Sequence, residues 1–105
     1  MPITDEQLSD LIRHIIEIAK PLQIILFGST ARGEAGPESD IDILVVVPDG
    51  TRRLDTAQAI YSNLPSLKFA VDIVVATETD ISDYKDFPGL VYREALRDGR
   101  VLYAA

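Results

Sequence analysis

The sequence contains no cysteine, and this absence removes several classes of function at once. Without thiols the chain has no disulfide framework, no thiolate nucleophile and no cysteine-ligated zinc, and cysteine redox chemistry is excluded with them. At 105 residues the chain is long enough for one hydrophobic core and too short for a second. We therefore expect a single domain over residues 1–105.

Long hydrophobic runs are also absent. The longest apolar run is Ile43 to Val47, far below the roughly 18 residues that a membrane-spanning helix requires. The N-terminus lacks a basic region followed by an apolar segment, which is the pattern of a secretory signal. These observations predict a cytoplasmic protein with no membrane partner.

Positive charge is scarce. Ten Lys and Arg residues stand against 17 Asp and Glu residues, which gives a formal net charge of −7. Affinity for a nucleic-acid backbone comes mostly from clustered Lys and Arg, and here only Arg52 and Arg53 are adjacent. Nucleic acid is therefore not expected as a direct partner, and a basic partner protein fits this surface better than a long RNA.

Hydrophobic periodicity and turn residues predict helices that alternate with strands. Thr4 and Gln7 have the spacing of a capping box before an apolar stripe of helical period. The helices are predicted at Asp5–Lys20, about Arg52–Tyr61 and about Pro88–Asp98. The strands are predicted at Leu22–Phe27, Asp40–Val47 and Leu67–Ala76, with a short edge strand at Val101–Tyr103.

The remaining segments are predicted to be turns and loops. Ser29–Gly33 is expected to be the opening turn of a short helix, and Glu34–Ser39 is expected to be a loop. Thr77–Phe87 is polar and acidic and is expected to be a loop that can include a helical turn. The order of elements indicates the α/β (α+β) class, a small mixed sheet of three to four strands flanked by about four helices.

A glycine turn follows the first predicted strand. Gly28-Ser-Thr-Ala-Arg-Gly33 has the outer spacing of a P-loop but lacks its Gly-Lys-Ser/Thr ending, so it is not a Walker A motif. A Gly-Ser turn that opens a helix still presents backbone N–H groups and the Ser29 hydroxyl to a phosphate, and Arg32 could add positive charge. The alternative is an ordinary strand-to-helix turn with no ligand, and the turn alone does not distinguish the two.

A pair of aspartates follows the turn. Side chains alternate along a strand, so Asp40 and Asp42 project to one face while Ile41 and Ile43 point to the other. Mg²⁺ prefers a few carboxylate oxygens together with water and substrate phosphate, which this spacing can provide. The alternative is that Asp40 only ends the preceding turn and Asp42 lies at a solvent-exposed strand end.

A third aspartate interrupts the third predicted strand. Asp72 is flanked by Val71 and Ile73, and an acid in a dry core is costly unless it is paired or bound to a metal. The alternative is an edge strand on which Asp72 faces water. If the two aspartate-bearing strands are neighbours, three carboxylates converge, and such a group requires a divalent cation.

Together these residues resemble the polymerase-beta-type nucleotidyltransferase superfamily. The resemblance rests on Gly28-Ser29-x-x-Arg32-Gly33, then Ser39-Asp40-x-Asp42, then Asp72 in a later apolar strand. It extends over nearly the whole chain, including the ending Tyr92–Tyr103. At this length the chain is most similar to the minimal nucleotidyltransferases, which in prokaryotes are commonly paired with a HEPN-domain protein.

The resemblance implies a role for each matching position. Gly28 and Ser29 would hold the triphosphate tail of the nucleotide, and Arg32 would either assist them or brace the loop. Asp40 and Asp42 would ligate Mg²⁺, and Asp72 would complete the metal site and accept the proton of the attacking hydroxyl. These three aspartates are the expected catalytic residues.

The activity implied is a Mg²⁺-dependent transfer of a nucleoside monophosphate, AMP from ATP, to a hydroxyl acceptor with release of pyrophosphate. The acceptor would lie on a partner protein, such as a tyrosine of a HEPN toxin, and the chain would be the antitoxin of that pair. The alternative is a non-catalytic antitoxin or binding subunit that neutralises its partner by contact and only binds nucleotide. Larger superfamily members add a domain that grips the base or the acceptor, which this chain lacks, so the identity of both stays open.

Overall fold

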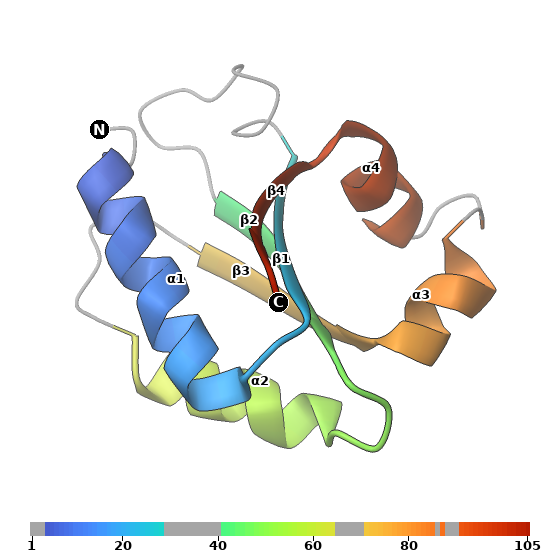
Figure 1. The fold of residues 1–105 in the computed structure, drawn as a ribbon, viewed down its shortest axis with the longest axis horizontal. Helices are drawn as coiled ribbons and strands as arrows, with labels where there is room; N and C mark the ends of the chain where they lie inside the picture. Colours follow the sequence, from blue (N-terminus) through green and yellow to red (C-terminus); the bar gives the residue numbers. More distant parts are fainter. Residues whose placement is uncertain (1–3, 29–40, 65–70, 86, 88–90) are drawn as a thin grey trace.

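The computed structural model describes residues 4–28, 41–64, 71–85, 87 and 91–105. In this part of the chain the backbone forms four helices and four strands (Figure 1). Their order is α1 (Asp5–Ala19), β1 (Gln23–Phe27), β2 (Ile41–Val47), α2 (Arg53–Ser62), β3 (Val71–Thr77), α3 (Glu78–Tyr84), α4 (Val91–Asp98) and β4 (Arg100–Ala104).

The four strands form one mixed sheet in the order β3-β2-β1-β4. β1 is antiparallel to both of its neighbours, β2 and β4, whereas β2 and β3 are parallel. Parallel neighbours need a crossover connection, and α2 lies in the segment that joins β2 to β3. The small mixed sheet with flanking helices confirms the predicted fold class.

Helices cover both faces of the sheet, with α1 and α2 on one side and α3 and α4 on the other (Figure 1). β2 lies in the interior of the sheet and is buried on both faces. Its Ile43 and Val45 pack in the cluster on the α1 and α2 side, and its Leu44 and Val46 pack in the cluster on the α3 and α4 side. This double burial explains the run of five consecutive apolar residues.

The first helix begins as the sequence predicts. The Thr4 hydroxyl accepts a hydrogen bond from the Gln7 backbone N–H at 3.1 Å, and the Gln7 side chain accepts from the Thr4 N–H at 2.9 Å. The helix ends at Ala19, because Lys20 has the left-handed conformation (φ 46°). The predicted helix Asp5–Lys20 is therefore confirmed to within one residue.

The predicted loop at Thr77–Phe87 is wrong over Glu78–Tyr84, which form α3. A second capping box explains why this helix forms. The Thr77 hydroxyl accepts from the Asp80 N–H at 3.1 Å, and the Asp80 carboxylate accepts from the Thr77 N–H at 3.0 Å. Aspartate takes the place of the usual Glu or Gln in this box.

Other predictions fall partly on residues that the structure does not describe. The helical turn at Ser29–Gly33, the loop at Glu34–Ser39 and the first residues of the strand predicted from Leu67 lie outside the described residues. The predicted edge strand at Val101–Tyr103 is confirmed as β4. Among the described residues, no helix has the length and apolar character to cross a membrane.

Candidate active site

Three of the residues singled out by the sequence lie at one end of the sheet. β1 ends at Phe27, which is the register partner of Asp42 on β2, and Asp42 is in turn the register partner of Asp72 on β3. Gly28 follows Phe27 directly. Neighbouring strands lie about 4.7–4.9 Å apart, so the residues of this row are close together. We call this the aspartate end of the sheet.

The two aspartates project from the same face of the sheet. Residues an even number of positions apart on a strand share a face. Asp42 therefore shares a face with Leu44 on β2, and Asp72 shares a face with Ala76 on β3. Leu44 and Ala76 pack in the cluster on the α3 and α4 side. The side chains of Asp42 and Asp72 therefore lie on the α3 and α4 side, while Ile41 is buried in the opposite cluster as the predicted alternation requires.

Gly28 lies so close to Asp42 that a larger residue in its place would be strained. Its φ of +77° lies in the left-handed region that L side chains rarely adopt. A Cβ at this position would also collide with Asp42 Oδ2 and approach Asp42 Cγ to 3.3 Å. Gly28 thus brings bare backbone close to the carboxylate of Asp42.

Asp72 is exposed, and the expectation that it interrupts a buried strand is wrong. β3 is an edge strand, and Asp72 is its exposed residue, while Ile73, Val75 and Ala76 are buried. The alternative reading, an edge strand with Asp72 facing water, is the one that the structure shows. The condition that β2 and β3 be neighbours is nevertheless met, so two of the three aspartates are adjacent.

The described donor set suits a hard cation. Asp42 and Asp72 offer carboxylate oxygens from adjacent strands, and Mg²⁺ takes oxygen ligands while it keeps several waters. Within the described residues, no group of three or more His, Cys, Asp or Glu side chains could hold a metal. Asp40, Ser29 and Arg32 lie outside the described residues, so the roles expected for them stay predictions.

Sequence reasoning missed one residue beside this site. Tyr61, near the end of α2, accepts a hydrogen bond from the backbone N–H of Ile73 at 2.7 Å. This contact fastens the edge strand at the residue that follows Asp72. A tyrosine at the polar end of a helix gives no signal of such a role, because the contact depends on how α2 packs against β3.

The opposite end of β2 and β3 also carries aspartates, and each has donors. We call it the threonine end. Asp49 accepts hydrogen bonds from the Thr79 N–H at 3.0 Å and the Thr79 hydroxyl at 2.7 Å. The Asp80 carboxylate accepts a hydrogen bond from the Thr77 backbone N–H and forms an ion pair with Arg53 at 2.9 Å.

These contacts shift the ionisation of both acids at the threonine end. The Thr79 hydroxyl, followed by the Thr79 backbone N–H, lowers the pKa of Asp49. The Thr77 backbone N–H is the main cause that lowers the pKa of Asp80, with burial acting against it and Arg53 assisting. Asp49 and Asp80 therefore hold the β2–α2 turn and the start of α3 in place.

Comparison with known proteins shows the family. The sequence model of the nucleotidyltransferase domain matches residues 8–102, which is nearly the whole chain. The chain belongs to the nucleotidyltransferase domain family. A candidate protein adenylyltransferase of Methanocaldococcus jannaschii is 41% identical to this nucleotidyltransferase over 81 residues, 77% of each chain.

Solved structures show the same fold. A toxin–antitoxin crystal structure with AMP-PNP contains a chain that is 25% identical, with a TM-score of 0.61, and the match covers 98% of this nucleotidyltransferase and 75% of that chain. A mutant of the toxin–antitoxin MntA–HpeT gives 25% identity and a TM-score of 0.58, over 99% and 75% of the two chains. A candidate nucleotidyltransferase from Sulfolobus solfataricus, 22% identical with a TM-score of 0.56 over 99% and 92%, shares the fold.

Proposed function

We propose that this nucleotidyltransferase transfers AMP from ATP to a hydroxyl group of a partner protein, and that it is the antitoxin of a toxin–antitoxin pair. The observation that carries the proposal is the row formed by Gly28, Asp42 and Asp72, in which a glycine turn contacts one of two adjacent carboxylates. The 41% identical relative, named for protein adenylylation, supports a protein acceptor. The likeness to a toxin–antitoxin structure with AMP-PNP supports an adenine nucleotide and a toxin partner.

Mg²⁺ is the proposed cofactor, held by Asp40, Asp42 and Asp72. A divalent cation bound there would neutralise phosphate charge and lower the pKa of a hydroxyl next to it. Two acidic side chains on adjacent strands in register repel each other, and this repulsion is relieved when they share a cation. The all-oxygen donor set fits Mg²⁺ better than a softer metal.

The remaining steps belong to the residues of the chain. The N–H groups of the turn at Gly28 and Ser29 would bind the triphosphate tail, and Arg32 would add positive charge there. The acceptor oxygen would form a bond to the α-phosphorus as the bond to the pyrophosphate oxygen breaks. Asp72, which is exposed and therefore open to an acceptor, would take the proton of that hydroxyl.

The partner is proposed to be a HEPN-domain toxin. The resemblance to minimal nucleotidyltransferases supports this class, and the net charge of −7 favours a protein over a polynucleotide acceptor. The cytoplasmic location and the single domain over residues 1–105 belong to the same proposal.

The proposal is tested with ATP labelled at the α-phosphate, Mg²⁺ and a purified HEPN-domain protein from the same organism. The Asp42→Asn variant should abolish transfer of label to the toxin. Asp49→Asn is the matched control, because Asp49 follows the other end of the same strand and its contacts are structural. Label transfer that survives Asp42→Asn unchanged would overturn the mechanism.

Neutralisation by contact alone is separated from catalysis by a second variant. Replacing Asp40, Asp42 and Asp72 by Ala removes the proposed metal site together with the proposed proton acceptor. If the chain acts by adenylylation, this triple variant should no longer suppress the toxin although it still folds. Full suppression by the triple variant would make contact the function.

A further inference from the structure

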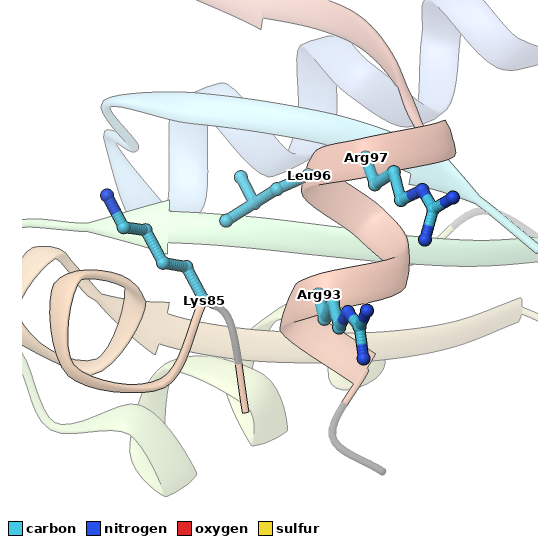
Figure 2. Close-up of a pocket in the computed structure, with 4 residues that line it drawn as sticks. All are labelled: Lys85, Arg93, Leu96 and Arg97. Atoms are coloured by element: carbon cyan, nitrogen blue, oxygen red, sulfur yellow. The ribbon is translucent and has the colours of Figure 1, made fainter. Parts of the chain in front are cut away.

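Three basic side chains surround a hollow on the surface of α3 and α4. The hollow has a volume of about 350 Å³ and is lined by Lys85, Arg93, Leu96 and Arg97 (Figure 2). Lys85 caps the C-terminal end of α3, and the other three belong to α4. In Figure 2 the two guanidinium groups extend to one side of α4, while Leu96 points toward Lys85.

The described basic residues fall into two groups, those with an ion pair and those without, and Lys20 and Arg100 belong with the three cations of the hollow in the second group. Arg13, Arg52 and Arg53 each form an ion pair with an aspartate. Within the described residues, neither Lys85 nor the two arginines of α4 form an ion pair. Three of the five described cations without an ion pair therefore line this one hollow, on a chain whose net charge is −7.

The stability of α4 does not account for both arginines. Arg97 lies in the last turn, where the negative end of the helix dipole favours a cation. Arg93 lies in the first turn, where the positive end of the dipole disfavours it. Arg93 and Arg97 are also four residues apart, so they are neighbours on the helix surface and repel each other. An anion bound between them would relieve both unfavourable terms.

Apolar side chains accompany the charges. Leu96 is 39% exposed, and Tyr84 and Phe87, on either side of Lys85 in the sequence, are 43% and 56% exposed. The two aromatic rings contact each other edge to face, with centroids 6.1 Å apart. Exposed aromatic residues and arginine are the residue types enriched in protein interfaces.

We propose that this basic hollow docks an acidic segment of a partner protein, a segment that presents glutamate or aspartate beside an apolar residue. Carboxylates would pair with Arg93, Arg97 and Lys85, and the apolar residue would contact Leu96. The charge complementarity is that of a protein surface rather than of a polynucleotide. Binding to a phosphate backbone uses a long basic stripe, whereas these cations gather at one hollow of an acidic chain.

Helices α3 and α4 cover one face of the sheet (Figure 1). Residues of α4 and the C-cap of α3 line the hollow, and Asp42 and Asp72 project from that same face of the sheet. A protein docked at the hollow would therefore approach the molecule from the side onto which Asp42 and Asp72 project. The docking proposal goes beyond the proposed function and does not depend on it, because binding is measured without nucleotide or transfer.

The test uses the whole chain and a short peptide that alternates glutamate with leucine. Titration followed by nuclear magnetic resonance should shift the signals of Lys85, Leu96 and Arg97. The double variant Arg93→Glu with Arg97→Glu should weaken binding by about tenfold or more, the scale of losing close charge pairs at an interface. A peptide in which glutamine replaces glutamate should not bind.

The matched control is the double variant Arg13→Glu with Arg52→Glu. It changes the net charge equally but acts on α1 and before α2, away from the hollow. The milder pair Arg93→Gln with Arg97→Gln keeps the test valid if charge reversal disturbs folding. Equal weakening by the control, or binding of the peptide elsewhere, would overturn the proposal. Tighter binding of inorganic pyrophosphate or a single-stranded oligonucleotide at the hollow would overturn it too.

Discussion

The two ends of β2 and β3 carry acids of the same kind in opposite circumstances. At the threonine end, Asp49 accepts hydrogen bonds from the Thr79 hydroxyl and backbone N–H, and Asp80 accepts from the Thr77 backbone N–H and the Arg53 guanidinium. At the aspartate end, Asp42 and Asp72 are register partners on adjacent strands, and a glycine turn contacts one of them. Asp72 has no hydrogen bond or ion pair with another described residue.

The difference separates structural acids from candidate functional acids. A carboxylate that already accepts several hydrogen bonds has little capacity left for a ligand, and its contribution is to hold the chain in place. Two carboxylates in register on adjacent strands repel each other and gain by sharing a cation. Variants at the two ends should therefore differ, with activity lost at the aspartate end and stability lost at the threonine end.

The largest effect is expected from Asp72→Asn compared with Asp80→Asn. Asp72→Asn removes a proposed metal ligand and proton acceptor, so label transfer from ATP should fall by at least about a hundredfold, the scale of losing one group that stabilises a transition state. Its thermal unfolding should stay close to that of the wild type because Asp72 is exposed. Asp80→Asn should do the reverse, with a lower unfolding temperature and retained transfer. If Asp72→Asn and Asp80→Asn changed label transfer and unfolding temperature in the same way, the distinction between functional and structural acids would be wrong.

Gly28→Ala should lower both activity and stability. The new Cβ collides with Asp42 Oδ2, and the φ of +77° strains any L side chain, at a cost of about 1–3 kcal/mol. Gly50→Ala is the control, since Gly50 has φ +92° but no atom within 4 Å of an added Cβ. Urea denaturation and transfer assays should show strain in both variants and lost transfer only in Gly28→Ala. Full transfer by Gly28→Ala would mean that the close approach to Asp42 is not needed.

Tyr61→Phe should loosen the aspartate end without removing any of its acids. The Ile73 N–H loses its 2.7 Å acceptor, which is expected to cost about 1 kcal/mol. Amide hydrogen exchange should therefore rise at Ile73, and transfer should fall by severalfold. Tyr84→Phe is the control, because its described contact is with the ring of Phe87. Unchanged exchange at Ile73 would show that the hydroxyl does not hold β3.

The smallest effect is expected from pH. The pKa values of Asp49 and Asp80 are lowered from 3.8 in the folded chain. Each acid therefore adds stability above its unfolded pKa, and this stability is lost as the pH falls through the lower folded pKa. Urea denaturation at a series of acidic pH values should show this loss, and Asp49→Asn should make it smaller. If Asp49→Asn lost as much stability at acidic pH as the wild type does, the Asp49 carboxylate would not stabilise the fold.

Local chemistry made part of the fold predictable. The Thr4 and Gln7 spacing gave the start of α1, and the run of five apolar residues gave β2. α3 was missed because its capping box uses aspartate and because none of its residues is buried, so no apolar stripe marks it. Capping geometry, rather than periodicity, is the signal that could have found this helix.

The candidate site was predictable in its residues but not in their surroundings. The pairing of Asp42 with Asp72 could be anticipated only on the condition that their strands are neighbours. The exposure of Asp72 depends on β3 being an edge strand, which follows from the pairing of β4 with β1 at the other edge. Such long-range pairing, like the contact of Tyr61 with Ile73, cannot be predicted from the spacing of residues that are close in sequence.

The position of β4 has a consequence for synthesis of the chain. β1 is synthesised before the other strands of the sheet, but its second neighbour, β4, is synthesised after all of them. Until then the nascent protein presents Ile24, Ile25 and Leu26 on an unpaired edge, the kind of strand that invites aggregation. The strand that leads into Gly28 is therefore protected on both sides only once β4 has been made.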